Sequence, residues 1–162
     1  MNKLKLSGVV KESTVDGPGL RYTIFAQGCP HECKGCHNPD SHDFDGGYEQ
    51  DIASLAKDIK KNKYLSGITL SGGEPFCQAA AFCTLCDILP GIQVIVYSGY
   101  TFDEIIANED FMPLLLKTDI LIDGRYEEET KNPLLIFRGS ENQRVIDVKQ
   151  SLLQNKIIEI EF

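Results

Sequence analysis

Residues 67–89 read GITLSGGEPFCQAAAFCTLCDIL, which is a short apolar run, a tight turn and a longer apolar segment in direct succession. The run at residues 67–72 contains β-branched side chains and predicts a strand that is covered on both faces. After two glycines and a proline, residues 75–89 have the length and spacing of a helix. A strand that passes directly into a helix is the repeating unit of a parallel α/β sheet.

The same alternation recurs along the chain. The predicted strands are residues 21–28, 67–72, 92–99, 118–124, 144–148 and 156–162, of which the last has no helix behind it. The predicted helices are residues 48–63, 75–89 and 102 to about 116. Pro113 is expected to kink the third helix or to end it early, because proline lacks the N–H that a helix interior needs.

This alternation predicts right-handed βαβ units, as in an α/β barrel or an open doubly wound sheet. A complete eight-fold barrel typically needs about 250 residues, whereas the chain has 162. We therefore expect a single domain over residues 1–162 that forms an incomplete, laterally open (β/α) barrel. Ligands bind at the carboxyl ends of the parallel strands in both architectures, so the motifs that follow strands define the candidate site.

The composition limits the possible partners. Apolar residues make up 42% and charged residues 25% of the chain, as in ordinary soluble proteins. Twenty-four acidic against 16 basic residues give a net charge of -8, which argues against nucleic acid as a partner. No apolar run is long enough to span a membrane, and residues 1–12 lack the apolar core of a signal peptide. We therefore expect a cytoplasmic protein.

Three cysteines, Cys29, Cys33 and Cys36, lie in the stretch QGCPHECKGCHNP directly after the first predicted strand. Thiolates are the usual ligands of iron–sulfur clusters, and a four-iron cube held by three of them leaves one iron open to a substrate. The alternative is a closed zinc site with three cysteines and one histidine. The histidines near enough in sequence to complete it are His31, His37 and His42.

The turn SGGEP, residues 71–75, follows the second of these strands. Gly72 and Gly73 let the backbone approach a ligand closely, and Pro75 suits the first position of a helix. The carboxylate of Glu74 is suited to an ammonium group. The alternative is a tight turn with a solvated Glu74.

The remaining cysteines, Cys77, Cys83 and Cys86, have the spacing C-x5-C-x2-C, which raises the question of a second cluster. The apolar stripe of the predicted helix consists of Ala79, Phe82, Cys83, Cys86 and Leu89. We therefore interpret Cys83 and Cys86 as small buried apolar residues.

Together these motifs resemble the radical S-adenosylmethionine superfamily, in which C-x3-C-x2-C follows the first barrel strand and GGE follows the next. Five stretches are similar to the activating proteins of anaerobic, class III ribonucleotide reductases: VDGPGLR, GCPHECKGCHNP, YSGYT, DILIDGRYE and RGSENQR. The similarity runs over about residues 10–147. It implies a barrel of the radical S-adenosylmethionine type.

The resemblance implies the main cofactor ligands. Cys29, Cys33 and Cys36 would hold a [4Fe-4S] cluster, whose open iron binds the amino and carboxylate groups of S-adenosylmethionine. The Gly72-Gly73-Glu74 motif matches the one that contacts the methionine amino group.

The resemblance also implies that the backbone of Gly35, Cys36 and His37 lies against the adenine. Many members of the superfamily have an aromatic residue where Gly35 stands, so an aromatic contact to adenine is not expected here. His37 is expected to contribute through its backbone alone. We interpret His31 and His42 as solvated or turn residues.

Weaker similarities add three residues to the cofactor site. Ser98 is expected near the ribose, and Asp123 and Arg125 stand where related activases have Asp-x-Lys, so that Arg125 would pair with the cofactor carboxylate. The alternative for Arg125 is a surface ion pair with Glu127 or Glu128.

The resemblance finally implies a reaction. A reduced cluster passes one electron to S-adenosylmethionine, and the resulting 5′-deoxyadenosyl radical takes a hydrogen atom from a glycine of the reductase's catalytic subunit. The electron would come from a donor such as flavodoxin or ferredoxin. The alternatives are an activase of another glycyl radical enzyme, of the formate-lyase type, and a zinc-binding module without turnover.

Overall fold

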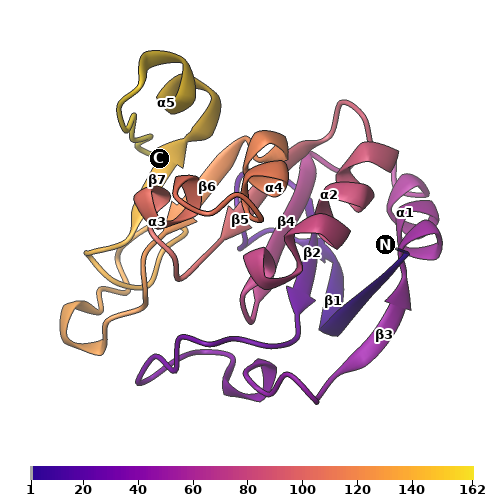
Figure 1. The fold of residues 1–162 in the computed structure, drawn as a ribbon, viewed down its shortest axis with the longest axis horizontal. Helices are drawn as coiled ribbons and strands as arrows, with labels where there is room; N and C mark the ends of the chain where they lie inside the picture. The colour runs from indigo at the N-terminus through magenta and orange to yellow at the C-terminus, as the bar shows by residue number, and fades with distance from the viewer. Residues whose placement is uncertain (1) are drawn as a thin grey trace.

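A seven-stranded sheet runs through residues 2–162, the part of the chain that the computed structural model describes (Figure 1). The strands are β1 (Lys3–Ser13), β2 (Arg21–Ala26), β3 (Tyr48–Asp51), β4 (Gly67–Gly72), β5 (Gln93–Tyr97), β6 (Ile120–Asp123) and β7 (Arg144–Asp147). Their order is β3-β1-β2-β4-β5-β6-β7. Since β3 and β7 are the two edges, the sheet is open.

Four central strands are parallel. β2 pairs with β4, β4 with β5 and β5 with β6, all in parallel register. Ile24, Ile68, Leu70 and Val96 on these strands are completely buried. Long apolar runs are typical of parallel strands that are covered on both faces, so this part of the prediction is confirmed.

The helices are α1 (Ile52–Lys60), α2 (Ala79–Ile88), α3 (Phe102–Ile106), α4 (Met112–Lys117) and α5 (Val148–Gln154), and the 3-10 turns are η1 (Pro39–Ser41), η2 (Pro75–Gln78) and η3 (Glu128–Thr130). α2 packs between α1 and α4 on one face of the sheet (Figure 1). The apolar core lies between these helices and the strands. None of the helices in residues 2–162 combines the length and apolar character needed to cross a bilayer.

The predicted boundaries of the first and third helices, residues 48–63 and 102 to about 116, were wrong. Residues 48–51 form strand β3, and the Asp51 side chain accepts a hydrogen bond from the Ser54 N–H to begin α1. The segment predicted as one helix from residue 102 is α3 followed by α4. Pro113 lies in the first turn of α4, where its missing N–H costs nothing, rather than inside a helix.

Both ends of the chain also differ from the prediction. β1, in an alternating and charged stretch that was not predicted as a strand, pairs antiparallel with β2 and β3. β7 runs antiparallel to β6, and residues 156–162 form only an isolated bridge to it through Glu159. The connection from β6 to β7 contains only the 3-10 turn η3 and no crossover helix, so β7 does not pair in parallel. After β7, α5 is short, and Asn155 reverses the chain in the left-handed region.

Candidate functional site

The carboxyl ends of the parallel strands carry the candidate site. A cavity of about 110 Å³ is lined by the cysteine loop after β2, by Gly72 and Gly73 at the end of β4, by residues 97–99 at the end of β5, and by Ile122 and Gly124 at the end of β6. The structure therefore brings together six predicted site residues from three separate motifs, namely Cys29, Cys33, Cys36, Gly72, Gly73 and Ser98.

The three cysteines on this cavity are free thiols of intermediate exposure. Burial raises the pKa of the Cys29 thiol to about 11 and also raises that of Cys33. The Cys36 sulfur lies 3.3 Å from Nε2 of His42 and accepts a hydrogen bond from the Asn38 N–H. All three thiols line the cavity, and the raised pKa values keep the Cys29 and Cys33 thiols neutral at neutral pH.

The donor set fits a cluster. Among residues 2–162, no three histidine, cysteine or acidic side chains converge closely enough to hold a single metal ion. A four-iron cube spreads its thiolate ligands around its own width, so three thiols along the wall of one cavity fit such a group.

Backbone hydrogen bonds fix the cysteine loop. Within the loop, the Gly28 N–H donates to the Ser41 carbonyl at 2.7 Å and the Cys29 N–H to the His42 carbonyl at 3.1 Å. The Glu74 N–H donates to the Gly28 carbonyl at 2.8 Å and joins the loop to the turn after β4. The loop and the GGE turn are therefore one rigid unit.

Glu74 is completely buried at the centre of this unit. Its carboxylate accepts hydrogen bonds from the Phe76 N–H at 3.1 Å, the Gly99 N–H at 2.8 Å and the Ser98 hydroxyl at 2.9 Å. Nε2 of His31 lies 2.6 Å from the same carboxylate. The alternative of a solvated Glu74 is wrong, because four donors from three segments surround the group.

His31 is one of several cavity residues that the sequence interpretation did not place in the site. Its side chain is 4% exposed, so the prediction of a solvated residue is wrong. The ring packs edge to face on Tyr100 with centroids 4.5 Å apart. A side chain at Gly99 would collide with the His31 ring. The glycine in YSGYT was the one local signal of this close contact.

Asp123 and Arg125 have protein partners. The Asp123 carboxylate is buried and accepts from the Phe102 N–H at 2.7 Å and from Nη2 of Arg144 at 2.6 Å, so it holds the start of α3 and β7. Arg125 forms an ion pair with Glu104 at 3.2 Å. The alternative prediction of a surface ion pair was therefore right in kind, but the partner is neither Glu127 nor Glu128.

A second cavity, of about 380 Å³, adjoins the first and shares Cys36, Tyr97, Tyr126 and Gln143 with it. His37 also lines it, and its ring lies 5.2 Å from that of Tyr126. Gly35 has a positive φ of 77°, and a side chain there would collide with the Glu128 carboxylate. The volume is in the range of cavities that bind organic ligands.

The other cysteines lie elsewhere. Cys86 is buried, as predicted, whereas Cys83 is half-buried and Cys77 is exposed. Burial raises the pKa of the Cys86 thiol to about 12, which keeps it neutral and unreactive.

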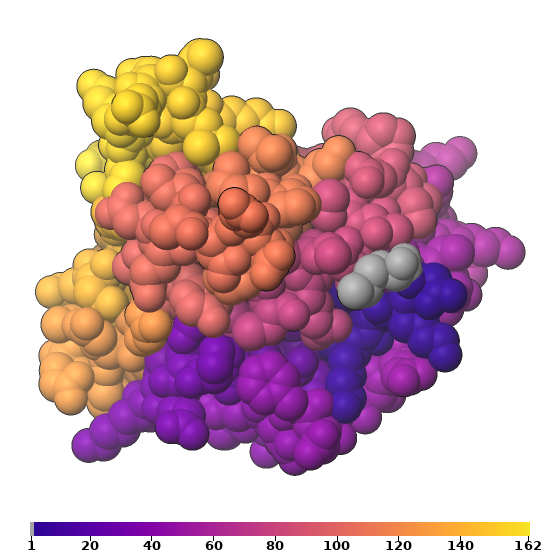
Figure 2. All heavy atoms as spheres, viewed as in Figure 1, coloured from indigo at the N-terminus to yellow at the C-terminus, as the bar shows by residue number. Residues whose placement is uncertain are grey.

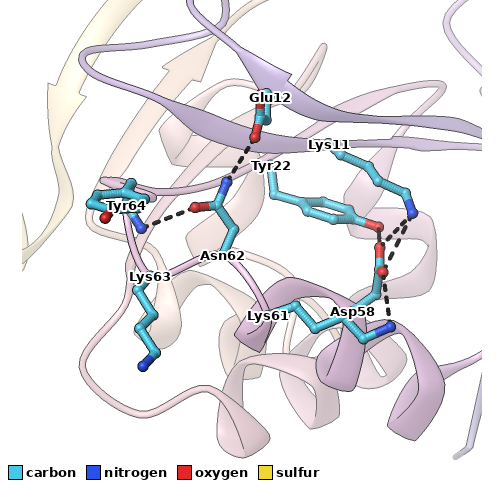
Figure 3. Close-up of a pocket in the computed structure, with 8 residues that line it drawn as sticks. All are labelled: Lys11, Glu12, Tyr22, Asp58, Lys61, Asn62, Lys63 and Tyr64. Carbon is cyan, nitrogen blue, oxygen red and sulfur yellow. Dashed lines mark hydrogen bonds and ion pairs between the residues drawn. The ribbon is translucent and has the colours of Figure 1, made fainter.

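A larger cavity of about 610 Å³ is lined by residues of β1, β2, α1 and the segment after α1 (Figure 3). Tyr22, near the start of β2, donates its hydroxyl proton to Asp58 at 2.7 Å, and Lys11 pairs with the same carboxylate at 3.2 Å (Figure 3). Because the amino end of β2 forms it, this cavity is separate from the cysteine site.

Comparisons with known proteins agree with this site. Residues 15–146 match the family described as 4Fe-4S single cluster domain. The anaerobic ribonucleoside-triphosphate reductase-activating protein of Pasteurella multocida is 34% identical over 143 residues, which cover 80% of this chain and 88% of that protein. The chain belongs to this family of activating proteins. Two further members are the proteins of the same name from Escherichia coli K12 (35% identity, 81% of this chain, 90% of that protein) and Enterobacteria phage T4 (32%, 81% and 86%).

The family membership covers the whole candidate site. The matched segment, residues 15–146, contains the three cysteines on the cavity and the GGE turn, together with the Ser98, Asp123 and Arg125 positions. The sequence resemblance to activating proteins is thereby confirmed.

Proposed function

We propose that this chain activates an anaerobic ribonucleoside-triphosphate reductase by using a [4Fe-4S] cluster and S-adenosylmethionine to generate a glycyl radical on it. The observation that carries the proposal is the meeting of Cys29, Cys33 and Cys36 with the GGE turn at one cavity. Membership of the activating-protein family supports the identity of the partner.

Cys29, Cys33 and Cys36 would hold the cluster. A cluster held by these three thiolates would leave one of its four irons open to bind S-adenosylmethionine. When bound, the reduced cluster and S-adenosylmethionine supply the radical that takes a hydrogen atom from the partner's glycine.

The chain's own residues position these groups. Glu74, His31, Ser98 and Gly99 form a buried hydrogen-bonded hub that joins the cysteine loop to the ends of β4 and β5. Gly72, with a φ of 90°, and Gly73 expose their backbone to the cavity. The cluster ligands and the cofactor-binding backbone are thus held at a constant separation. Where cofactors carry the chemistry, this positioning is the protein's main contribution.

We also propose that the open sheet is an incomplete (β/α) barrel of the radical S-adenosylmethionine type. Its support is the four parallel strands, whose carboxyl ends form the site, and the two unjoined edges β3 and β7. An open side suits a substrate that is part of another protein, because a polypeptide segment must reach the cavity.

The test begins with protein that is purified anaerobically and reconstituted with iron and sulfide. After reduction, we expect 5′-deoxyadenosine from S-adenosylmethionine, and a glycyl radical signal in electron paramagnetic resonance when the anaerobic reductase is added. Stoichiometric zinc without nucleoside product would contradict the proposal and support the zinc-binding alternative. Radical formation on a formate-lyase type partner but not on the reductase would support the other alternative.

The electron donor is part of the proposal. We propose a cytoplasmic one-electron carrier such as flavodoxin or ferredoxin, because cleavage needs single electrons at low potential. Replacing the chemical reductant by each reduced carrier, with and without the other components, identifies which one supports 5′-deoxyadenosine formation.

A further inference from the structure

Residues 131–140, between η3 and β7, form an arm with a fixed base. Lys131 and Ser140 form an antiparallel β-bridge. The Asn132 N–H donates to the Gly139 carbonyl at 3.1 Å. The two sides of the arm are thus paired by their backbones, and the tip between them has a defined position.

The tip of this arm, residues 134–137, consists of four consecutive apolar residues, Leu-Leu-Ile-Phe, and none of them is buried. Leu134 is 89% exposed and Ile136 is 51% exposed. Phe137 has a φ of 63°, a left-handed conformation that is costly for a bulky side chain. Four apolar side chains in a row at a surface are unfavourable unless that surface binds something.

The tip borders the mouth of the second cavity, which adjoins the cysteine cavity. Phe137 and Arg138 line the cavity of about 380 Å³ together with Cys36 and His37. The ring of Phe162, which is 49% exposed, meets that of Phe137 edge to face at 5.1 Å and extends the apolar surface. In Figure 2 the arm lies at the same edge of the molecule as the cysteine loop.

We propose that the apolar tip, residues 134–137, is the surface on which the reductase docks while its glycine-bearing segment occupies the adjoining cavity. This inference rests on the proposed function. The occupant is a polypeptide with an apolar surface, because the tip offers aliphatic and aromatic side chains and its burial would remove them from water. The position beside Cys36 favours the reductase over a second copy of this chain, since only a partner whose residue enters the cavity has to cover its mouth.

Two activities of the protein are expected to depend differently on the tip. Cleavage of S-adenosylmethionine by the chemically reduced protein needs only the cysteine loop and the GGE turn, whereas radical transfer needs the docked partner as well. Leu134 and Ile136 are outside the residues that line either site cavity, so they can be changed without touching the cofactor site.

The test uses the full-length, cluster-loaded double variant Leu134→Glu/Ile136→Glu. Cleavage without reductase is expected to stay within about twofold of wild type, while the glycyl radical yield at subsaturating reductase falls at least about tenfold, as for central apolar residues of interfaces. Leu153→Glu is the matched control, because Leu153 is 79% exposed on α5, far from the arm in Figure 1. The control is expected to retain both activities.

The apolar double variant Leu134→Met/Ile136→Val is expected to retain radical transfer, because it keeps the apolar surface. A wild-type radical yield from the charged double variant would overturn the docking surface and leave the proposed function intact. Loss of a wild-type dimer in sedimentation, with unchanged radical yield, would also overturn it and assign the tip to self-association. Absence of 5′-deoxyadenosine from the wild type itself would instead contradict the proposed function.

Discussion

A buried carboxylate is stable only where donors surround it, and Glu74 has such a shell. Its donors come from the cysteine loop, from the turn after β4 and from the turn after β5. One side chain therefore ties together three loops that are far apart in the sequence. The consequence for function is that the cluster ligands and the GGE backbone cannot move independently.

Replacing Cys33 by alanine is expected to remove the cluster and abolish cleavage of S-adenosylmethionine, because two thiolates do not hold a four-iron cube. Iron and sulfide analysis and 5′-deoxyadenosine formation measure the result. Cys83→Ala is the matched control, since this half-buried thiol lies on α2 away from the cavity. Loss of iron from the control would indicate a metal role for the second set of cysteines.

Glu74→Gln is expected to lower the free energy of unfolding by about 1–3 kcal/mol, because the amide group turns a donor toward donors and leaves one of them unpaired. Cleavage of S-adenosylmethionine is expected to fall as well. Urea unfolding of the cluster-free protein isolates the structural part. Glu49→Gln, on a side chain that is 71% exposed, should change stability by less than about 0.5 kcal/mol. Equal stabilities of the two variants would contradict the claim that the hydrogen bonds of Glu74 stabilise the fold.

At the scale of elements, the contacts that join different strands and loops lie at the two ends of the strands. Gly73 lies against the cysteine loop, where a Cβ would collide with the Gly28 carbonyl oxygen and approach the Ser41 oxygen to 2.9 Å. At the other end of the strands, the Arg21 guanidinium joins β2 to β4 and β5. The sheet is thus fastened at both ends by contacts that no single element contains.

Gly73→Ala is expected to displace the cysteine loop, since the new methyl group meets backbone rather than a flexible side chain. Overpacking of this kind typically costs about 1–3 kcal/mol. We expect lower iron loading after reconstitution and slower cleavage. Gly8→Ala is the control, because a Cβ at Gly8 has no atom within 4 Å. Normal iron loading of Gly73→Ala would contradict the claim that the close approach of Gly73 to the cysteine loop positions the cluster ligands.

Arg21→Met is expected to lower the free energy of unfolding by more than about 3 kcal/mol, because it leaves several buried acceptors unpaired. Nε of Arg21 donates to the Thr69 hydroxyl at 2.7 Å and Nη2 to the Ile68 carbonyl at 2.8 Å. Burial lowers the pKa of Arg21 to about 10, so it is charged at neutral pH. Chemical denaturation measures the loss. Arg125→Met, which breaks one exposed ion pair, should cost about 1 kcal/mol or less.

For the molecule as a whole, the core and the site are built from different parts of the chain. The core consists of apolar residues on the strands and on the helices that cover them. Cys29, Cys33 and Cys36 belong to none of its clusters and are of intermediate exposure. The fold is therefore expected to form first and to bind the cluster afterwards.

Removal of the cluster by a chelator is expected to leave the protein folded. Far-ultraviolet circular dichroism should keep its helix and strand signal, and thermal unfolding should remain cooperative at a lower midpoint, by linkage to the lost ligand. Small zinc domains behave differently, because they unfold without their metal. Loss of secondary structure on iron removal would show that the cysteine loop carries part of the fold.

Local patterns were sufficient for the centre of the molecule. The β-branched runs and helical spacing predicted the parallel units of β2, β4, β5 and β6, because short-range periodicity reflects which faces are buried. The cysteine spacing and the GGE turn predicted the cavity wall, since each motif follows a strand and parallel strands end together. The antiparallel strands were predicted less well. β1 is a charged strand that was not predicted, whereas β7 confirms the strand predicted at residues 144–148 but runs antiparallel because no crossover helix precedes it.

The partners within the site depend on contacts between distant residues. His31 meets Glu74 across 43 positions, and Arg144 meets Asp123 across 21. Arg125 pairs with Glu104 and not with its sequence neighbours. No local pattern encodes such pairs, because they form only when packed strands bring separate loops to one edge of the sheet. The sequence was therefore enough to place three thiols beside a GGE turn, whereas the buried hub that holds them together arises from the packing of the whole chain.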